Sequence, residues 1–67
     1  MSLDLRKIKI AQARACLSVN DIVNRTGLGR TTVSKTLNGK IVPNPKTVGL
    51  IAKALNIDVS ELFINEE

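Results

Sequence analysis

Hydrophobic residues recur with helical spacing in five stretches of the chain, and no alternating strand pattern lies between them, which predicts an all-α protein. The first stretch covers residues 3–16. Its apolar face holds Leu5, Ile8, Ala11, Gln12, Ala15 and Cys16. Ser2 can cap this helix, and Asp4 suits its first turn. We expect Cys16 to be a buried small hydrophobe on the inner side and Ile10 to be exposed on the outer side.

The next two stretches are short and are joined at Gly27. Ser18 and Asp21 have the spacing of a capping box, which predicts that a helix begins directly after Ser18. Gly27 suits the left-handed conformation that commonly ends a helix. A second helix is expected from Arg30 to about Asn38. Two helices joined by a tight turn have the layout of a helix-turn-helix, whose second helix enters the DNA major groove.

The polar face of that second helix suits contact with DNA. Its outward positions recur at i, i+3, i+4 and i+7 and hold Thr31, Ser34, Lys35 and Asn38. All four side chains can donate hydrogen bonds, and Arg30 projects from the start of the helix. Any solvated helix face carries polar residues, however, so a helical hairpin that never touches DNA explains this stretch equally well when it is taken alone.

Two further helices complete the pattern. A fourth is expected to begin at Pro45, which Asn44 can cap, and to end at Leu55. A last short helix, capped by Asp58, is expected to end at Leu62 or the residue after it. The sequence therefore predicts five helices in a single domain that spans residues 1–67, a size at which folding without metals or disulfides is feasible.

Composition narrows the range of functions. The chain has one Cys and no His, so it offers no internal disulfide, no metal cluster and no pairing of nucleophile and base. We therefore expect neither an enzyme nor a protein with a metal or another cofactor. No apolar run is long enough to span a membrane and no signal peptide is evident, so we expect a cytoplasmic protein without a membrane partner.

The charge is distributed unevenly along the chain. The net charge is +4, but residues 1–57 hold all ten Lys and Arg against two carboxylates, a local charge of +8. Residues 58–67 hold four carboxylates and no cation, a local charge of −4. A basic body favours a polyanion as partner, with the acidic end turned away from it, although solubility alone can also account for such charges.

The order of these parts resembles the XRE family of small helix-turn-helix regulators, typified by phage Cro and phage repressor DNA-binding domains. The resemblance covers about residues 5–63. The matching segments are Leu17-Ser18, Gly27, Thr32-Val33-Ser34, Asn38-Gly39-Lys40, Pro43-Asn44-Pro45-Lys46-Thr47, Ile51-Ala52-Lys53-Ala54-Leu55 and the stretch from Asp58 to Leu62. LacI-type headpieces share part of this pattern, but they begin directly with the helix-turn-helix. The resemblance implies a five-helix, lambda-repressor-like fold.

The same resemblance implies roles for individual residues. Carried over by position, the residues expected to contact bases are Arg30, Thr31, Thr32 and Lys35. Those expected to contact phosphates are Ser18, Ser34, Asn38 and Lys40, together with backbone N–H groups at the start of the first helix of the motif. The chemistry suits these roles, because Arg and Lys donate to guanine, Thr contacts thymine, and a helix N-terminus attracts phosphate.

Four positions depart from the family pattern. Val19 stands where many members have a Gln that contacts the DNA backbone, and a Val side chain cannot make that contact. Gly29 replaces the usual Ser or Thr cap, which should cost only a few tenths of a kcal/mol. Gln12 and Leu37 stand where many members pair a buried Arg with Glu. We expect the Gln12 amide to bond a backbone group instead.

Taken together, these features predict a sequence-specific transcriptional regulator, of repressor or Cro type and of prokaryotic or phage origin, that binds double-stranded DNA. We expect it to bind as a homodimer to a pseudo-palindromic operator with half-site centres about 10 bp apart. Leu62, Phe63 and Ile64, near an end with little chain to cover them, are the expected dimer contact. No small-molecule ligand is expected. The alternative is an antitoxin or another protein-interaction module of the same fold.

Overall fold

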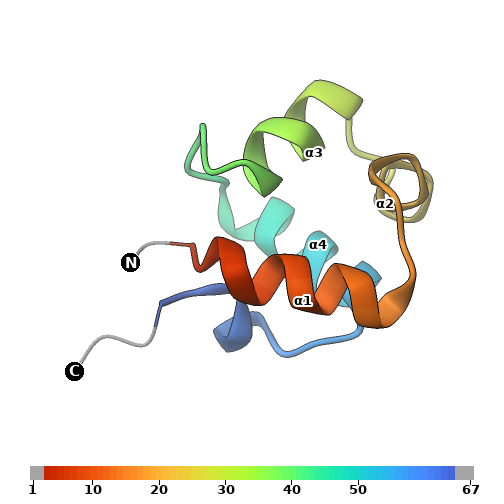
Figure 1. Cartoon of the computed structure of the whole chain (residues 1–67). Coiled ribbons are helices and arrows are strands. Elements are labelled where there is room, and N and C mark those ends of the chain that lie inside the picture. The colour runs from red at the N-terminus through yellow and green to blue at the C-terminus, as the bar shows by residue number, and fades with distance from the viewer. Residues whose placement is uncertain (1–2, 65–67) are drawn as a thin grey trace.

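The computed structural model describes residues 3–64, which form four α-helices and one turn of 3-10 helix (Figure 1). In chain order the elements are α1 (Leu5–Ala15), α2 (Val19–Thr26), α3 (Arg30–Leu37), α4 (Pro45–Leu55) and η1 (Val59–Leu62). The expected all-α class is confirmed. The expected count of five helices is not confirmed: four are α-helices, and the last short element, of four residues, is a single turn of 3-10 helix.

All five elements meet in one core. Helix α2 packs on α3 and α4, and η1 packs on α1 and α4. Each element contributes one of the most deeply buried large side chains, which are Ile8, Ile22, Val33, Ile51 and Leu62. Because α3 adds Val33 and Leu37 to this core, its inner face is fixed and its outer face is left to solvent.

Helix α1 begins two residues later than the sequence predicts. Asp4, rather than Ser2, caps it, since the Asp4 carboxylate accepts hydrogen bonds from the backbone N–H groups of Arg6 (3.1 Å) and Lys7 (3.2 Å). Leu3 lies outside the helix and forms an isolated antiparallel bridge with Phe63. The Asp4 N–H donates to the Leu62 carbonyl (2.7 Å). Pairing with the C-terminal segment therefore sets where α1 starts, and Ser2 lies outside the described residues.

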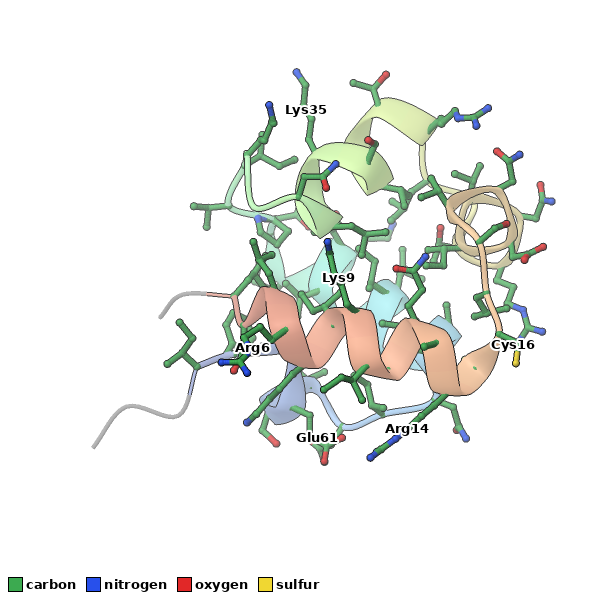
Figure 2. The ribbon with its side chains drawn as sticks, viewed as in Figure 1. Arg6, Lys9, Arg14, Cys16, Lys35 and Glu61 are labelled. Carbon is green, nitrogen blue, oxygen red and sulfur yellow. The ribbon has the colours of Figure 1, made fainter. Side chains whose placement is uncertain are left out.

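The end of α1 overturns the expectation that Cys16 is buried. Cys16 adopts the left-handed conformation (φ 56°), and its side chain is exposed at the edge of the molecule (Figure 2). The N–H of Leu17 donates to the carbonyl of Gln12 (3.1 Å), which closes the helix end. Leu17, with 8% of its surface exposed, takes the buried place that the helical pattern had assigned to Cys16.

Two glycines make the turns on either side of α3. Gly27 ends α2 with φ 75°, and the hydroxyl of Thr26 fixes this turn by donating to the Ile22 carbonyl (2.7 Å) and accepting from the Leu28 N–H (3.2 Å). Gly39 follows α3 with φ 70°, and a Cβ there would lie 3.0 Å from a methyl of Leu5. Gly39 thus allows the end of α3 to approach the start of α1.

The remaining predicted helix ends are confirmed. The Asn44 side chain accepts from the backbone N–H of Thr47 (2.8 Å), and Pro45 occupies the first helical position of α4. At the start of η1, the Asp58 carboxylate accepts from the Ser60 N–H (2.9 Å). Ile10 is 53% exposed, as the helical pattern of α1 predicts.

Candidate nucleic-acid interface

Helix α3 presents a polar and basic outer surface that runs from Arg30 in its first turn to Lys35 in its last. Arg30, Thr31 and Lys35 are exposed, and Thr32 is partly covered. Lys35 points away from the body of the molecule (Figure 2). The cap at Gly29 has no side chain, so nothing local covers the start of the helix. The structure therefore leaves three of the four expected base-contacting residues open to solvent, and the fourth, Thr32, is partly buried.

The end of α3 gathers the polar residues expected to contact phosphates. The Asn38 amide donates to the Ser34 hydroxyl at 3.5 Å, a long hydrogen bond that is easily exchanged for another acceptor. Lys40 is exposed directly after the Gly39 turn, and its backbone N–H donates to the Lys35 carbonyl (2.8 Å). These residues lie at the opposite end of α3 from Arg30.

The capping box predicted at the start of α2 is confirmed, and it engages the side chain of Ser18, a residue that is also expected to contact phosphate. Ser18 and Asp21 form a complete capping box, with the Asp21 N–H donating to the Ser18 hydroxyl (3.1 Å). The backbone N–H and the hydroxyl of Ser18 both donate to the Asp21 carboxylate, at 2.8 and 2.9 Å. A phosphate at this end would therefore meet the N–H groups of Val19 and Asn20, which belong to the first helical turn and have no partner within the helix.

The capping box makes stability sensitive to acid. Hydrogen bonds from the Ser18 N–H and then from the Ser18 hydroxyl hold the pKa of Asp21 below its ordinary value of 3.8. The stabilisation is thus complete above that value and is lost as the pH falls through the lower pKa of the folded state. We expect an Asp21→Asn chain to lose less free energy of unfolding than wild type as the pH drops below about 4, measured by urea denaturation at a series of pH values.

Asp58→Asn is the parallel variant for this measurement, because hydrogen bonds from Ser60 lower the pKa of Asp58 in the same way. The chain that carries both substitutions should have the weakest dependence on acid. If Asp21→Asn left the acid dependence of wild type unchanged, the capping box would not be its source.

Lys9 on α1 lies beside the candidate interface formed by α2 and α3, although no sequence motif includes it. It lines one hollow with Gln12, Ala13, Cys16, Leu17 and Ser18, and a second with Leu5, Arg6, Leu37 and Asn38. The stripe of Lys9, Gln12, Ala13 and Cys16 has the spacing i, i+3, i+4 and i+7, which could have indicated this side of α1. The Gln12 amide, which was expected to bond a backbone group, forms no hydrogen bond among residues 3–64.

The residues expected at a dimer contact do not share one environment. Leu62 is 1% exposed and belongs to the core of its own chain, so its expected exposure is wrong; η1 turns it inward between α1 and α4. Phe63 is half-buried, and Ile64 is 46% exposed. Phe63 borders a shallow hollow of about 250 Å³ that Leu3, Leu5, Gly39, Ile41, Val42 and Pro43 also line. Val42 is 92% exposed beside it.

Within residues 3–64, the structure shows neither a membrane-spanning helix nor a metal-binding cluster. No helix in that range has both the length and the apolar character needed to span a membrane. The same residues contain no group of three or more His, Cys, Asp or Glu side chains placed to hold a metal ion.

A short helix joined through a left-handed glycine to a second helix with a fixed inner face and a polar outer face defines a helix-turn-helix protein. The helix-turn-helix family model (HTH_3) matches residues 17–62, from the residue before the Ser18 cap through η1. The chain therefore belongs to the XRE family of helix-turn-helix proteins, which are DNA-binding regulators and typically not enzymes. Neither the search of curated proteins nor that of solved structures gave a match.

Proposed function

We propose that this chain is a sequence-specific transcriptional regulator, of repressor or Cro type, whose helix α3 enters the major groove of an operator. The observation that carries the proposal is the outer face of α3, where Arg30, Thr31 and Lys35 are exposed on a helix whose inner face is buried. An arginine and a lysine at this position can donate to guanine, and a threonine can contact thymine. Such a protein would act where the DNA is, in the cytoplasm of a prokaryotic or phage-infected cell.

The remaining predicted contacts hold the protein on the duplex backbone. The N–H groups at the start of α2 would face one phosphate. The polar cluster of Ser34, Asn38 and Lys40 would face another. Ser18 would contribute through its position at the cap, and its hydroxyl could turn to a phosphate only by leaving Asp21. Phosphate contacts carry no sequence information, so specificity would come from Arg30, Thr31 and Lys35.

We propose that the regulator binds as a homodimer to a pseudo-palindromic operator. Helix α3 has eight residues and is roughly 12 Å long, so a single copy covers only a few base pairs. A two-fold dimer doubles this coverage, with half-site centres about 10 bp apart. Ile64 and Val42, both exposed, together with half-buried Phe63 beside the apolar hollow, are the proposed contact.

Selection of bound duplexes from a random pool tests this function directly. A recurrent sequence with two related halves is the expected result, and footprinting should show protection of both halves. Recovery of no preferred sequence would argue against sequence-specific recognition. Protection of one asymmetric half by a monomer would argue against the dimer alone.

A protein-interaction module, such as an antitoxin of the same fold, is the second candidate. One observation favours it, which is that exposed Ile10 lies in a hollow of about 220 Å³ with Lys7, Ala11, Arg14, Ile57 and Glu61. Arg14 and Glu61 lie on the side of α1 that faces away from α3 (Figure 2). If the chain only bound a partner protein, the wild-type and Arg30→Ala chains would bind that partner equally well. Neither chain would bind a DNA duplex, even at low salt.

A further inference from the structure

We infer that Lys9 of α1 binds a DNA phosphate beside the start of α2, so that the interface extends beyond the helix-turn-helix. This inference rests on the proposed function. It adds a contact from an element that lies outside the residues matched by the family model. It also gives a function to one of the ten cations that lie within residues 1–57.

The position of Lys9 carries the inference. Lys9 is exposed and is the one residue shared by two neighbouring hollows, of about 380 and 310 Å³. The first hollow leads to Ser18 at the start of α2, and the second leads to Asn38 at the end of α3. Figure 2 shows the Lys9 side chain on the side of α1 that faces α3. A duplex backbone that followed these two hollows from the start of α2 to Asn38 would pass over Lys9.

The charges at the start of α2 give Lys9 a specific task. The Asp21 carboxylate lies against the backbone N–H of Ser18 and would repel a phosphate brought to that end. Lys9 is the one cation among the residues that line the hollow containing Ser18. Its ammonium can donate to the phosphate and offset the carboxylate, which allows α2 to retain its capping box when DNA is bound.

Lys7 is the matched control, because it carries the same charge on the same helix and is also exposed. It lines the hollow with Ile10, Arg14 and Glu61, on the other side of α1 from the hollow that leads to Ser18. An effect of overall charge would be the same for Lys7 and Lys9. A direct contact would distinguish them.

Lysine acetylation of the wild-type chain, with and without a duplex of mixed sequence at low salt, tests the contact without any substitution. We expect the duplex to slow acetylation of Lys9 several-fold, together with that of Lys35 and Lys40, and to leave Lys7 unchanged. Protection of Lys35 and Lys40 without Lys9 would overturn this inference and leave the proposed function standing. Protection of none of them would overturn both.

The salt dependence of binding gives a second, quantitative test on the same duplex. Each phosphate contact contributes about 0.9 to the slope of log affinity against log salt concentration. We expect Lys9→Ala to reduce this slope by about 0.9 per protomer and Lys7→Ala to leave it near the wild-type value. Equal reductions in the two variants would mean that both cations act only through the general field of the protein, and the inference would be wrong.

Discussion

Replacing Leu62 with Ala is expected to lower the free energy of unfolding by about 2–5 kcal/mol. Leu62 is 1% exposed and joins the core although it lies close to the end of the described chain. It is the deeply buried side chain that η1 contributes, and η1 packs on both α1 and α4. Truncation would remove buried contacts and leave a cavity between those helices. Small domains have stabilities of about 5–15 kcal/mol, so the loss would be a large share of the total.

Ile64→Ala is the matched control for this measurement. Ile64 lies two residues further along and is 46% exposed, so its truncation should change the free energy of unfolding by no more than about 0.5 kcal/mol. Both variants should be compared by urea denaturation at a concentration where the wild-type chain is monomeric, because dimerisation would add to the apparent stability. An equal cost for the two substitutions would contradict the assignment of Leu62 to the core.

The same pair separates folding from assembly. If Ile64 lies at the proposed dimer contact, Ile64→Ala should weaken self-association, measured by analytical ultracentrifugation, while the protomer stays folded. Leu62 cannot serve that contact while it is buried in its own chain. A dimer that was insensitive to Ile64→Ala would place the contact elsewhere on the surface.

The sequence predicted most helix ends because each is set by residues close together in the chain. Ser18 with Asp21, Asn44 with Pro45, and Gly27 each provide a cap or a left-handed turn from their own side chains or backbone. Local chemistry of this kind does not depend on the rest of the fold. The position of α3 and its inner and outer faces could therefore be derived before the structure was known.

The incorrect predictions concern the two ends of α1, where contacts with distant segments of the chain determine which residue caps the helix and which is buried. Ser2 and Asp4 are both acceptable caps for α1, and the pairing of Leu3 with Phe63 accompanies the choice of Asp4. The helix was expected to end at about Cys16 and does so, but Cys16 was expected to be buried, and the chain turns there so that Leu17 enters the core instead. Helical spacing alone does not show which side chain at the end of a helix enters the core, because tertiary packing decides it.

The candidate DNA-binding residues also fall into two groups, those that local sequence predicts and those that only the fold places. The outer face of α3 follows from helical spacing within one element, so the exposure of Thr31 and Lys35, and of Arg30 at the helix start, could be predicted from the sequence. Lys9 could not be placed without knowing how α1 lies against α2 and α3, because its relation to Ser18 and Asn38 is made by the fold. In the sequence, Lys9 is one of ten Lys and Arg residues, and the net charge does not show on which surface it lies.

Arg30→Ala and Lys40→Ala are expected to weaken DNA binding in different ways. Arg30 is the first residue of α3 and is exposed. In a helix-turn-helix the start of the second helix contacts the base edges, where a planar guanidinium can donate two hydrogen bonds to one guanine. We expect Arg30→Ala to cost about 1–3 kcal/mol of binding free energy on the selected operator and to relax base preference at one position in each half-site.

Lys40 provides the comparison because it is a cation at the other end of α3, beyond the Gly39 turn, where a phosphate of any sequence would meet its ammonium. Lys40→Ala should weaken binding to the operator and to a scrambled duplex by the same factor, and it should lower the salt slope by about one per protomer. Both variants should be titrated on both duplexes across a salt series. If Arg30→Ala also lost the same factor on the two duplexes, Arg30 would be a phosphate contact, and specificity would have to come from Thr31 and Lys35, the other exposed residues of that helix face.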